Sequence, residues 1–250
     1  MYKSKRVLSV VIPAYNEARF IGALLKRIGW VDLSAFSCTL EIIVVDDGSS
    51  DDTASVAGRF PGVTVESLAC NRGKGEAVKR GIARAGGDFI VIQDADLEYD
   101  PNDYVPMVEA ILSPGVDAVY GSRYLDHHGK RGLRAWVTGK YPGQSWRAYI
   151  GGRSLSLIAL YFTRRYLTDT VTALKLFRRD VIKPLDLKTT GFELDHEITS
   201  RILARGCHIV EVPISYFPRS KSEGKKIGLR DWIMAIRTFH RYGKIGKRAR

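Results

Sequence analysis

Two aspartates, Asp94 and Asp96, are separated by one residue and follow directly after an apolar run at 89–92. Two carboxylates this close repel each other unless a cation neutralises them. Their hard oxygen atoms suit Mg²⁺ or Mn²⁺, and Mg²⁺ is usually held by one or two carboxylates together with substrate phosphates. The pair therefore predicts a divalent-metal site for a phosphorylated ligand. The alternative is a solvated acidic turn, since short acidic pairs are common in turns.

Another candidate pair, Asp46 and Asp47, follows the predicted strand at 41–45. A carboxylate in this place can accept hydrogen bonds from a ribose or from the N–H groups of a base. The alternative for Asp47 is that it only shapes the turn before the next helix.

The segment at 71–75, Asn-Arg-Gly-Lys-Gly, has the composition of a phosphate-binding loop. It does not match the Walker A pattern, and Val78 stands where the dinucleotide fingerprint needs its third glycine. These departures disfavour ATP hydrolysis by a P-loop and hydride transfer. The segment predicts a tight turn at which Lys74 or backbone N–H groups approach a nucleotide.

The elements that must position these residues alternate between strand and helix patterns. We predict strands at 7–12, 41–45, 63–68, 89–93, 118–120 and 209–212, and helices at 20–28, 53–59, 76–85, 153–166, 194–205 and 229–239. This order predicts an α/β fold with a mostly parallel, doubly wound sheet and helices on both faces. Such sheets bind ligands outside the carboxyl ends of their strands. The candidates just after predicted strand ends are Tyr15, Glu17, Asp46, Asp47, Lys74, Asp94 and Asp96.

Some local features follow from turn and helix chemistry. Pro13 is expected to end the first strand, and Asn16 to cap the helix after it. Residues 126–149, rich in Gly, Lys and Arg, are expected to form a mobile loop region. The helix at 153–166 has an apolar face and basic ends, which suits packing on the core or on a membrane interface. We predict one domain over 1–228, followed by a basic amphipathic helix and tail at 229–250.

Composition limits the class of protein. The chain has 250 residues, of which 45% are hydrophobic, and this is enough for one substantial core and too apolar for a disordered chain. Three widely spaced cysteines argue against a disulfide framework. No apolar run approaches the roughly 20 residues of a bilayer span, and the N-terminus lacks the pattern of a signal peptide. The sequence therefore predicts a cytosolic protein.

The net charge of +12 is concentrated at the C-terminal end. From residue 219 onward there are eleven Lys and Arg against two acidic residues, which contribute +9 of that total. A basic tail on a nearly balanced domain predicts an anionic partner, which is a phosphate group, a nucleic acid or an acidic membrane surface. The alternative is a tail that only improves solubility.

Four segments occur in the order and spacing of family-2 inverting glycosyltransferases, which this chain resembles. They are Val-Val-Ile-Pro-Ala-Tyr-Asn-Glu at 10–17, Val-Val-Asp-Asp-Gly-Ser at 44–49, Asn-Arg-Gly-Lys-Gly at 71–75 and Asp-Ala-Asp at 94–96. Within that family the chain is similar to the dolichyl-phosphate mannose synthase branch, through segments at 121–124, 172–179 and 211–219. Together these motifs are highly specific, whereas no single one would be.

The resemblance implies a GT-A fold, the fold of nucleotide-diphospho-sugar transferases. It also implies transfer of a hexose, mannose or glucose, from a nucleotide diphosphate sugar to a dolichyl or undecaprenyl phosphate, with Mg²⁺ or Mn²⁺. GDP-mannose and UDP-glucose are both expected as donors, and UDP-N-acetylglucosamine stays open as a third. The residues that the resemblance assigns to the nucleoside are Pro13, Tyr15, Glu17, Val45 and Asp47. It assigns the metal to Asp94, Asp96 and Glu98 with the Ala95 backbone beside it, and the phosphates to Arg123, Arg219 and Lys225.

The acceptor decides whether a base is needed. A phosphate monoester has a second pKa of about 6, so near pH 7 it is largely dianionic and already nucleophilic. A sugar hydroxyl would need a positioned carboxylate. The alternative function is therefore transfer to a glycan hydroxyl in polysaccharide or cell-envelope synthesis, with Glu193, Asp195 or Glu197 as base. For the first function we expect Asp94, Asp96 and Arg219 to be the catalytic residues.

A non-catalytic basic module for nucleic acid or anionic membrane is the alternative outside enzymes. It is disfavoured because no nucleic-acid-binding signature is present and the carboxylates after the strands would repel a phosphate backbone. No nucleic-acid partner is expected. Many members of the family that this chain resembles carry C-terminal transmembrane helices, and this sequence shows no apolar run of that length. We therefore expect peripheral membrane attachment through the amphipathic segments, the basic tail or a separate membrane partner protein.

Overall fold

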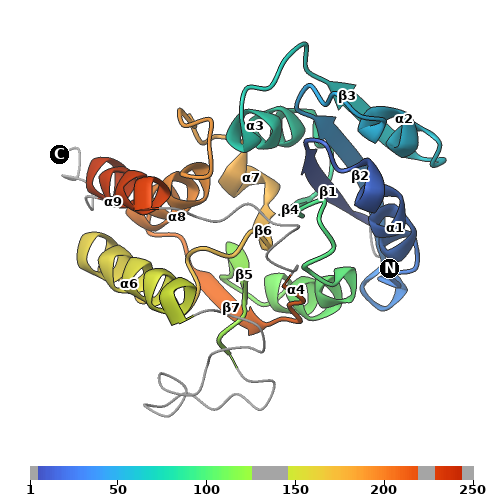
Figure 1. Ribbon diagram of the computed structural model, residues 1–250. Helices are drawn as coiled ribbons and strands as arrows, with labels where there is room; N and C mark the ends of the chain where they lie inside the picture. The colour runs from blue at the N-terminus through green and yellow to red at the C-terminus, as the bar shows by residue number, and fades with distance from the viewer. Residues whose placement is uncertain (1–4, 126–145, 219–228, 244–250) are drawn as a thin grey trace.

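The computed structural model describes residues 5–125, 146–218 and 229–243, which form a seven-stranded sheet flanked by helices (Figure 1). The strands are β1 (Arg6–Ala14), β2 (Cys38–Asp46), β3 (Val63–Ser67), β4 (Phe89–Ile92), β5 (Ala118–Ser122), β6 (Lys175–Arg178) and β7 (Ile209–Pro213). The helices are α1 (Ala18–Gly29), α2 (Thr53–Gly58), α3 (Lys74–Arg84), α4 (Tyr104–Ile111), α6 (Trp146–Thr163), α7 (Arg179–Ile182), α8 (Leu194–Ala204) and α9 (Leu229–Tyr242).

The strand order is β3-β2-β1-β4-β6-β5-β7. Every neighbouring pair is parallel except β4–β6 and β6–β5, because β6 alone runs the opposite way. The chain builds β1, β2 and β3 outward and then returns to place β4 on the other side of β1. The direction of winding thus reverses between β1 and β4, and a crevice at such a switch point is where doubly wound sheets bind ligands.

Two hydrophobic clusters cover the two faces of the sheet. Val10 and Ile12 of β1 belong to the cluster that contains side chains of α1, α2 and α4, and Val11 belongs to the cluster of α3, α7 and α8. Successive side chains of a strand point to opposite faces, so a continuous apolar run is what a strand buried on both faces requires. The predicted α/β fold with a mostly parallel sheet and helices on both faces is confirmed.

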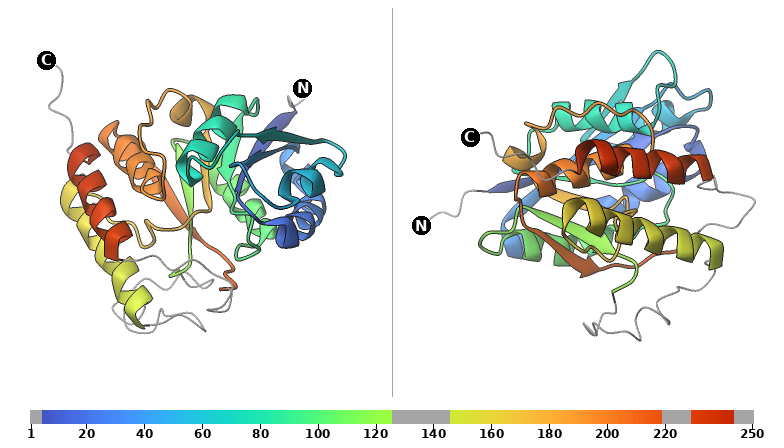
Figure 2. Two further views of the ribbon diagram at one scale, coloured as in Figure 1. Left: turned by 45° about the horizontal axis from the view of Figure 1, so that its top comes forward. Right: turned by 90° about the vertical axis from the view of Figure 1, so that its left-hand side faces the viewer.

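Helices α6 and α9 pack against each other and against α8, outside the helical layer on one face of the sheet (Figure 2). The predicted domain boundary at 228 lies outside the described residues. Among the residues that the structure describes, no helix is both long and apolar enough to cross a membrane.

Several sequence-based boundaries were wrong. Pro13 does not end the first strand but lies within β1, opposite Val45 of β2. Asn16 is not the helix cap: its φ is 55°, a left-handed value that asparagine tolerates, and its Oδ1 accepts a hydrogen bond from the backbone N–H of Ser50 in the neighbouring loop. Residue 17 takes the N-cap position of α1 without a side-chain cap.

The largest boundary error concerns α6. Residues 146–149, assigned to a mobile loop, form its first turn, and the rest of that predicted loop lies outside the described residues. The helix therefore begins seven residues before the predicted start at 153, and it ends at Thr163 rather than at 166. Its N-terminal half contains Gly151 and Gly152, whose low helix propensity disfavours a helix prediction there.

Candidate active site

The loops after β1 and β2 are joined directly at the carboxyl edge of the sheet. The N–H of Asp47 donates to the carbonyl of Ala14 over 2.8 Å, and the N–H of Glu17 donates to Oγ1 of Thr53 over 2.8 Å. Tyr15 lies in this loop with 46% of its surface exposed. Of the five predicted nucleoside residues, Pro13, Val45 and Asp47 are buried, so the ring of Tyr15 is the most accessible surface that this group offers a base.

Asp47 organises the loop that leads to α3. Its two carboxylate oxygens accept hydrogen bonds from the N–H groups of Arg72 and Gly73, each over 2.8 Å. The side chain is buried, and these donors fix it in place. The turn-shaping interpretation of Asp47 is therefore present in the structure, and any contact with a nucleoside would be in addition to it.

The start of α3 is pressed against the segment before α8. The carbonyl of Thr190 accepts hydrogen bonds from the N–H groups of Gly75 and Glu76, at 2.7 and 3.2 Å, where α3 has N–H groups without helical partners. Gly73 has φ 97°, and a Cβ there would lie 2.5 Å from the Thr190 oxygen. A glycine is required at that position on both counts. This contact fixes the place of Lys74, the first residue of α3.

Glu197 holds the segment that carries Thr190. Its buried carboxylate accepts hydrogen bonds from the N–H groups of Lys188 and Thr189, from the Thr189 hydroxyl and from Nε of Arg201. Burial opposes ionisation, but the Thr189 and Arg201 hydrogen bonds together bring the pKa of Glu197 below its usual value. This side chain is committed to structure, so its predicted role as an alternative base is disfavoured.

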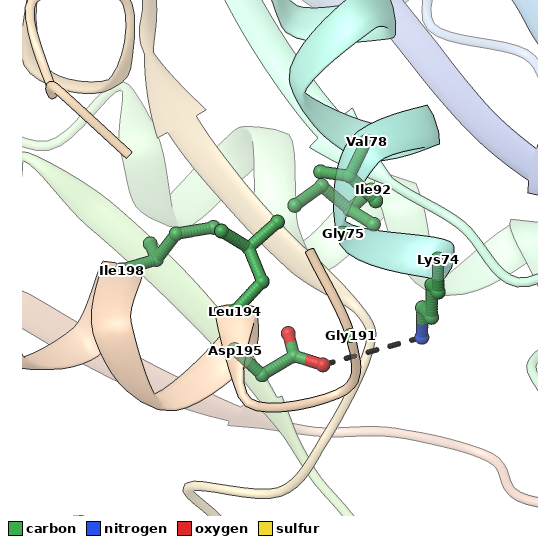
Figure 3. A pocket seen from close by; sticks show the side chains of 8 residues that line it. All are labelled: Lys74, Gly75, Val78, Ile92, Gly191, Leu194, Asp195 and Ile198. Atoms are coloured by element: carbon green, nitrogen blue, oxygen red, sulfur yellow. Dashed lines mark ion pairs between the residues drawn. The ribbon is translucent and has the colours of Figure 1, made fainter. Parts of the chain in front are cut away.

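The predicted metal ligand Asp94 is paired with a lysine. Nζ of Lys74 lies 2.6 Å from Oδ1 of Asp94 and 4.0 Å from Oδ2 of Asp195, toward which it points in Figure 3. Nζ of Lys175 lies 2.7 Å from Oδ1 of Asp195. Burial would lower the pKa of Lys74, but Asp94 and Asp195 raise it above its ordinary value and keep the ammonium charged. Neither Lys175 nor its pairing with Asp195 was predicted from the sequence.

Asp96 and Glu98 lie on a loop of unusual backbone. Oδ1 of Asp96 accepts the N–H of Glu98 over 3.1 Å, and Leu97 between them has φ 63°, which is rare for leucine. Oε2 of Glu98 accepts the Tyr216 hydroxyl over 2.6 Å, and the Glu98 carbonyl accepts the N–H of Phe217 over 2.8 Å. The segment after β7 therefore braces this loop. Phe217 is two residues before Arg219 in the sequence.

Asp103 also binds the segment after β7, since its Oδ2 accepts a hydrogen bond from the N–H of Ser215 over 2.8 Å. Burial raises the pKa of Asp103 to about 7, with the Ser215 N–H lowering it and Asp100 raising it. The unfolded chain loses this proton near pH 4, whereas the folded chain keeps it to about pH 7, so this group lowers stability as pH rises from 4 to 7.

Asp103→Asn keeps an oxygen that accepts the Ser215 N–H and cannot ionise. We expect the wild-type chain to lose stability relative to this variant between pH 5 and pH 8, as measured by urea unfolding midpoints at both values. Comparison with the variant cancels the effect of other titrating groups, such as His196. Burial lowers the pKa of His196 from 6.5 to about 4, so stability rises as pH increases between these two values. Equal changes in both proteins would show that Asp103 ionises normally.

The donor set fits a divalent cation shared with a substrate. Within residues 5–125, 146–218 and 229–243, no three His, Cys, Asp or Glu side chains form a cluster that would hold a metal by themselves. Asp94 and Asp96 nevertheless present carboxylates from one short loop after β4, at the switch point. Hard carboxylate ligands completed by phosphate oxygens are what Mg²⁺ and Mn²⁺ use in such sites. The pair is therefore suited to a cation that arrives with a diphosphate.

Arg123 lies close to this loop but its guanidinium is bound to a residue that the sequence analysis missed. Nε and Nη2 donate to the two carboxylate oxygens of Asp169 over 2.6 and 2.8 Å, and the guanidinium lies over the Tyr216 ring at 5.1 Å. Such a two-pronged pair is strong and directional. The geometry gives Arg123 a part in positioning Tyr216; contact with a phosphate stays a prediction. Arg219 and Lys225 lie outside the described residues.

Comparison with solved structures identifies the fold class. The chain superposes on glucosyl-3-phosphoglycerate synthase from Mycobacterium tuberculosis in complex with Mn²⁺, UDP and phosphoglyceric acid with a TM-score of 0.67 and 22% identity, over 98% of this chain and 81% of that one. It superposes on a mannosyltransferase from Pyrobaculum calidifontis in complex with GDP-Man and Mn²⁺ with a TM-score of 0.54 and 22% identity, over 85% and 56% of the two chains. The fold is thus the GT-A-like α/β fold of glycosyltransferases.

The sequence assigns the family. The family model described as glycosyl transferase family 2 matches residues 9–185, and the chain belongs to this family of glycosyltransferases. It is 32% identical over 225 residues to a dolichol-phosphate mannosyltransferase of Pyrococcus furiosus, covering 88% of this chain and 59% of that protein. It is 30% identical over 230 residues to an undecaprenyl-phosphate 4-deoxy-4-formamido-L-arabinose transferase of Edwardsiella ictaluri, covering 90% and 64%. The chain spans about three fifths of the length of these two relatives.

Proposed function

We propose that this chain is an inverting hexosyltransferase that moves mannose or glucose from GDP-mannose or UDP-glucose to a polyprenyl phosphate, with Mg²⁺ or Mn²⁺. Two relatives support this acceptor because their names specify transfer to dolichol phosphate and undecaprenyl phosphate. The two solved neighbours support the donor class and the metal because they contain Mn²⁺ with UDP or GDP-Man.

The observation that carries the choice of acceptor is the state of the alternative bases. Asp195 is bound to Lys175, and Glu197 accepts hydrogen bonds from the Thr189 backbone and from Arg201. Burial opposes ionisation of Asp195, but Lys175 and Lys74 bring its pKa below the usual value, which makes it a weak base. A dianionic phosphate can attack without a base to remove a proton. It therefore fits a site in which Asp195 and Glu197 are already bound to cationic side chains.

Each part of the site then has a defined task. Tyr15 and Glu17 would contact the nucleoside, and Asp94 and Asp96 would hold the divalent ion against the diphosphate. When bound, that ion would act as a Lewis acid on the departing diphosphate. The acceptor phosphate oxygen attacks the anomeric carbon from the opposite side, its new bond forms as the bond to the diphosphate breaks, and the configuration inverts.

Cationic side chains of the chain would assist this displacement. Arg219 and Lys225 would contact phosphates of the donor or acceptor, as the family resemblance implies. Membrane attachment of this enzyme, through its helices, its basic tail or a membrane partner protein, would bring it to the lipid acceptor and is part of the same proposal.

The direct test supplies radiolabelled GDP-mannose or UDP-glucose with Mn²⁺ and offers two acceptors. We expect label in a polyprenyl phosphate product with at least one donor and none on a glycan primer. Product on the glycan primer alone would overturn the proposed acceptor and support the hydroxyl alternative.

Glu193 provides a second test, since it is the remaining carboxylate that was predicted as a base. Its Oε1 accepts the N–H of Gly191 over 3.3 Å, and the residue is partly exposed. We expect Glu193→Gln to change the rate of transfer to polyprenyl phosphate by less than about threefold, because a general base contributes roughly 10²–10⁴-fold. A hundredfold loss of initial rate at saturating donor would identify Glu193 as a base and contradict the mechanism.

A further inference from the structure

Four side chains form an alternating series of charges that runs from the carboxylate pair into the protein. In order they are Asp94, Lys74, Asp195 and Lys175. The Lys74 ammonium is bound to Asp94 at 2.6 Å and faces Oδ2 of Asp195 at 4.0 Å. One cation therefore lies between two carboxylates, only one of which is a proposed metal ligand.

The carboxylate at the inner end is fixed in place. Lys175 is completely buried, binds Oδ1 of Asp195 and the carbonyl of Thr172, and lies over the Tyr120 ring at 5.2 Å. Because Oδ1 is anchored in this way, Oδ2 of Asp195 is directed toward Lys74. The buried ammonium of Lys175 on the far side also favours the ionised form of Asp195.

Lys74 is the member of the series that can move. Its ammonium is carried on a stem of four rotatable methylene groups, whereas one oxygen of Asp195 is fixed by the buried Lys175. A displacement of about 1 Å would bring its ammonium to the usual distance of a charged hydrogen bond from Oδ2 of Asp195. A small cavity of about 10 Å³ lies beside this path, lined by Lys74, Gly75 and Asp195 among others (Figure 3).

A divalent cation that binds Oδ1 of Asp94 competes with the ammonium of Lys74, which lies 2.6 Å from that oxygen. Mg²⁺ binds carboxylate oxygens at about 2.0–2.1 Å, so the two positive groups would lie only a few ångströms apart. Repulsion between like charges at that distance is strong in a site that is largely withdrawn from water. A cation that takes Oδ1 of Asp94 therefore displaces Lys74, and Asp195 is the carboxylate that already faces the ammonium, at 4.0 Å.

We propose that Lys74 is a mobile counter-ion, bound to Asp94 until a divalent cation takes that carboxylate and bound to Asp195 afterwards. The inference rests on the proposed metal site at Asp94 and Asp96 and extends it. It makes Asp195 a positioning residue, which acts through Lys74, and gives Lys175 the task of holding Asp195 in the receiving position. The chain thereby keeps Asp94 paired with a cation between turnovers without a permanently bound metal.

The first test measures binding of Mn²⁺ alone, without nucleotide, from the electron paramagnetic resonance signal of the free ion at pH 8. Lys74→Met removes the competing ammonium, and we expect it to bind Mn²⁺ at least tenfold more tightly than the wild type. Lys79→Met is the matched control, because Lys79 lies on the same helix and pairs with Glu76 at 2.7 Å. We expect that control to stay within twofold of the wild type. Equal affinity of the wild type and Lys74→Met would overturn the inference.

The second test removes the receiving carboxylate. The double variant Asp195→Asn/Lys175→Met takes away both buried charges together, so that neither is left unpaired. We expect it to bind Mn²⁺ about tenfold more weakly, because no second carboxylate is then available to bind Lys74 when Mn²⁺ displaces it from Asp94. Adding Lys74→Met should restore the affinity of Lys74→Met alone. Weakening that persists without Lys74 would make Asp195 a direct ligand and overturn the inference.

Circular dichroism identifies any variant that does not fold. If the double variant does not fold, the comparison of Lys74→Met with Lys79→Met alone tests the counter-ion role of Lys74. The transfer assay separates this inference from the function on which it rests. If the wild type binds Mn²⁺ and transfers sugar while Lys74→Met binds it no more tightly, only the counter-ion role fails. If no variant binds Mn²⁺, the inference fails, and the transfer assay then decides whether the metal site fails with it.

Discussion

Replacing Asp96 with asparagine should lower the turnover number for sugar transfer by about a thousandfold, because the neutral amide cannot balance the charge of a cation on the departing diphosphate. Asp96 is partly exposed, and its Oδ1 accepts one backbone hydrogen bond, from Glu98. An amide oxygen can accept that bond too, so the loop should keep its conformation. Initial rates at saturating donor and Mn²⁺, together with thermal unfolding, measure both effects.

The matched control is Glu109→Gln, which removes one exposed carboxylate from α4. We expect that variant to retain wild-type turnover and wild-type thermal stability. An Asp96→Asn enzyme that keeps more than a tenth of the wild-type rate with the same metal requirement would remove Asp96 from the metal site.

Replacing Glu197 with alanine should lower the free energy of unfolding by about 3 kcal/mol, since it removes a buried carboxylate from a charged partner and from several donors. The affected donors are the Thr189 N–H and hydroxyl, the Lys188 N–H and Arg201. Urea unfolding at pH 7 gives the value. The same segment caps α3 through Thr190, so the variant should also disturb the placement of Lys74 and lower activity.

The pH dependence of the wild type gives a second measure of this carboxylate. Because the folded state lowers the pKa of Glu197, its stabilisation is complete above the unfolded value near 4.5 and is lost as pH falls through the folded value. Glu193→Gln, on the segment just before α8, is the control and should leave stability within about 0.5 kcal/mol of the wild type. A Glu197→Ala protein within 1 kcal/mol of the wild type would show that its hydrogen bonds contribute little.

The parallel part of the sheet was predictable because its strands carry a simple signal. The run at 89–92 is continuous and apolar, and the run at 7–12 is apolar except for Ser9, as strands covered on both faces require. The chemistry-bearing residues follow both runs within a few positions. The switch point between β1 and β4 then brings Tyr15 and Asp94 to the same edge. The carboxyl-edge location of the candidate site followed from this alternation, without any knowledge of side-chain contacts.

Strand β6 was missed because its sequence is Lys-Leu-Phe-Arg, with a charge at each end. Lys175 is fully buried there, since Asp195 and the Thr172 carbonyl bind its ammonium, and Arg178 donates to the carbonyls of Ile111 and Val116. A charged residue is expected to be exposed until its partners are known, and all of these partners except Thr172 are at least 20 residues away in the sequence. No pattern in the sequence could have supplied them.

The same limit applies to the site itself. Residue types identified Asp94 and Asp96, and the family resemblance added Arg123. Asp169 and Lys175 were given no role, because they act through contacts that only the tertiary structure makes. Asp195 was predicted as a base because it is an acid near the site, and the structure shows it between two lysines. A sequence motif identifies the carboxylates that can contact a ligand. The lysines that bind those carboxylates belong to other elements of the fold.

The most direct measurement is isothermal titration calorimetry of GDP-mannose and UDP-glucose into the purified chain, with Mn²⁺ and then with excess EDTA. We predict that at least one donor binds in the presence of Mn²⁺, that its affinity falls at least tenfold in EDTA, and that Asp96→Asn abolishes the difference. A donor that binds with the same affinity in EDTA and in Mn²⁺ would contradict the claim that the two aspartates hold a cation against the diphosphate.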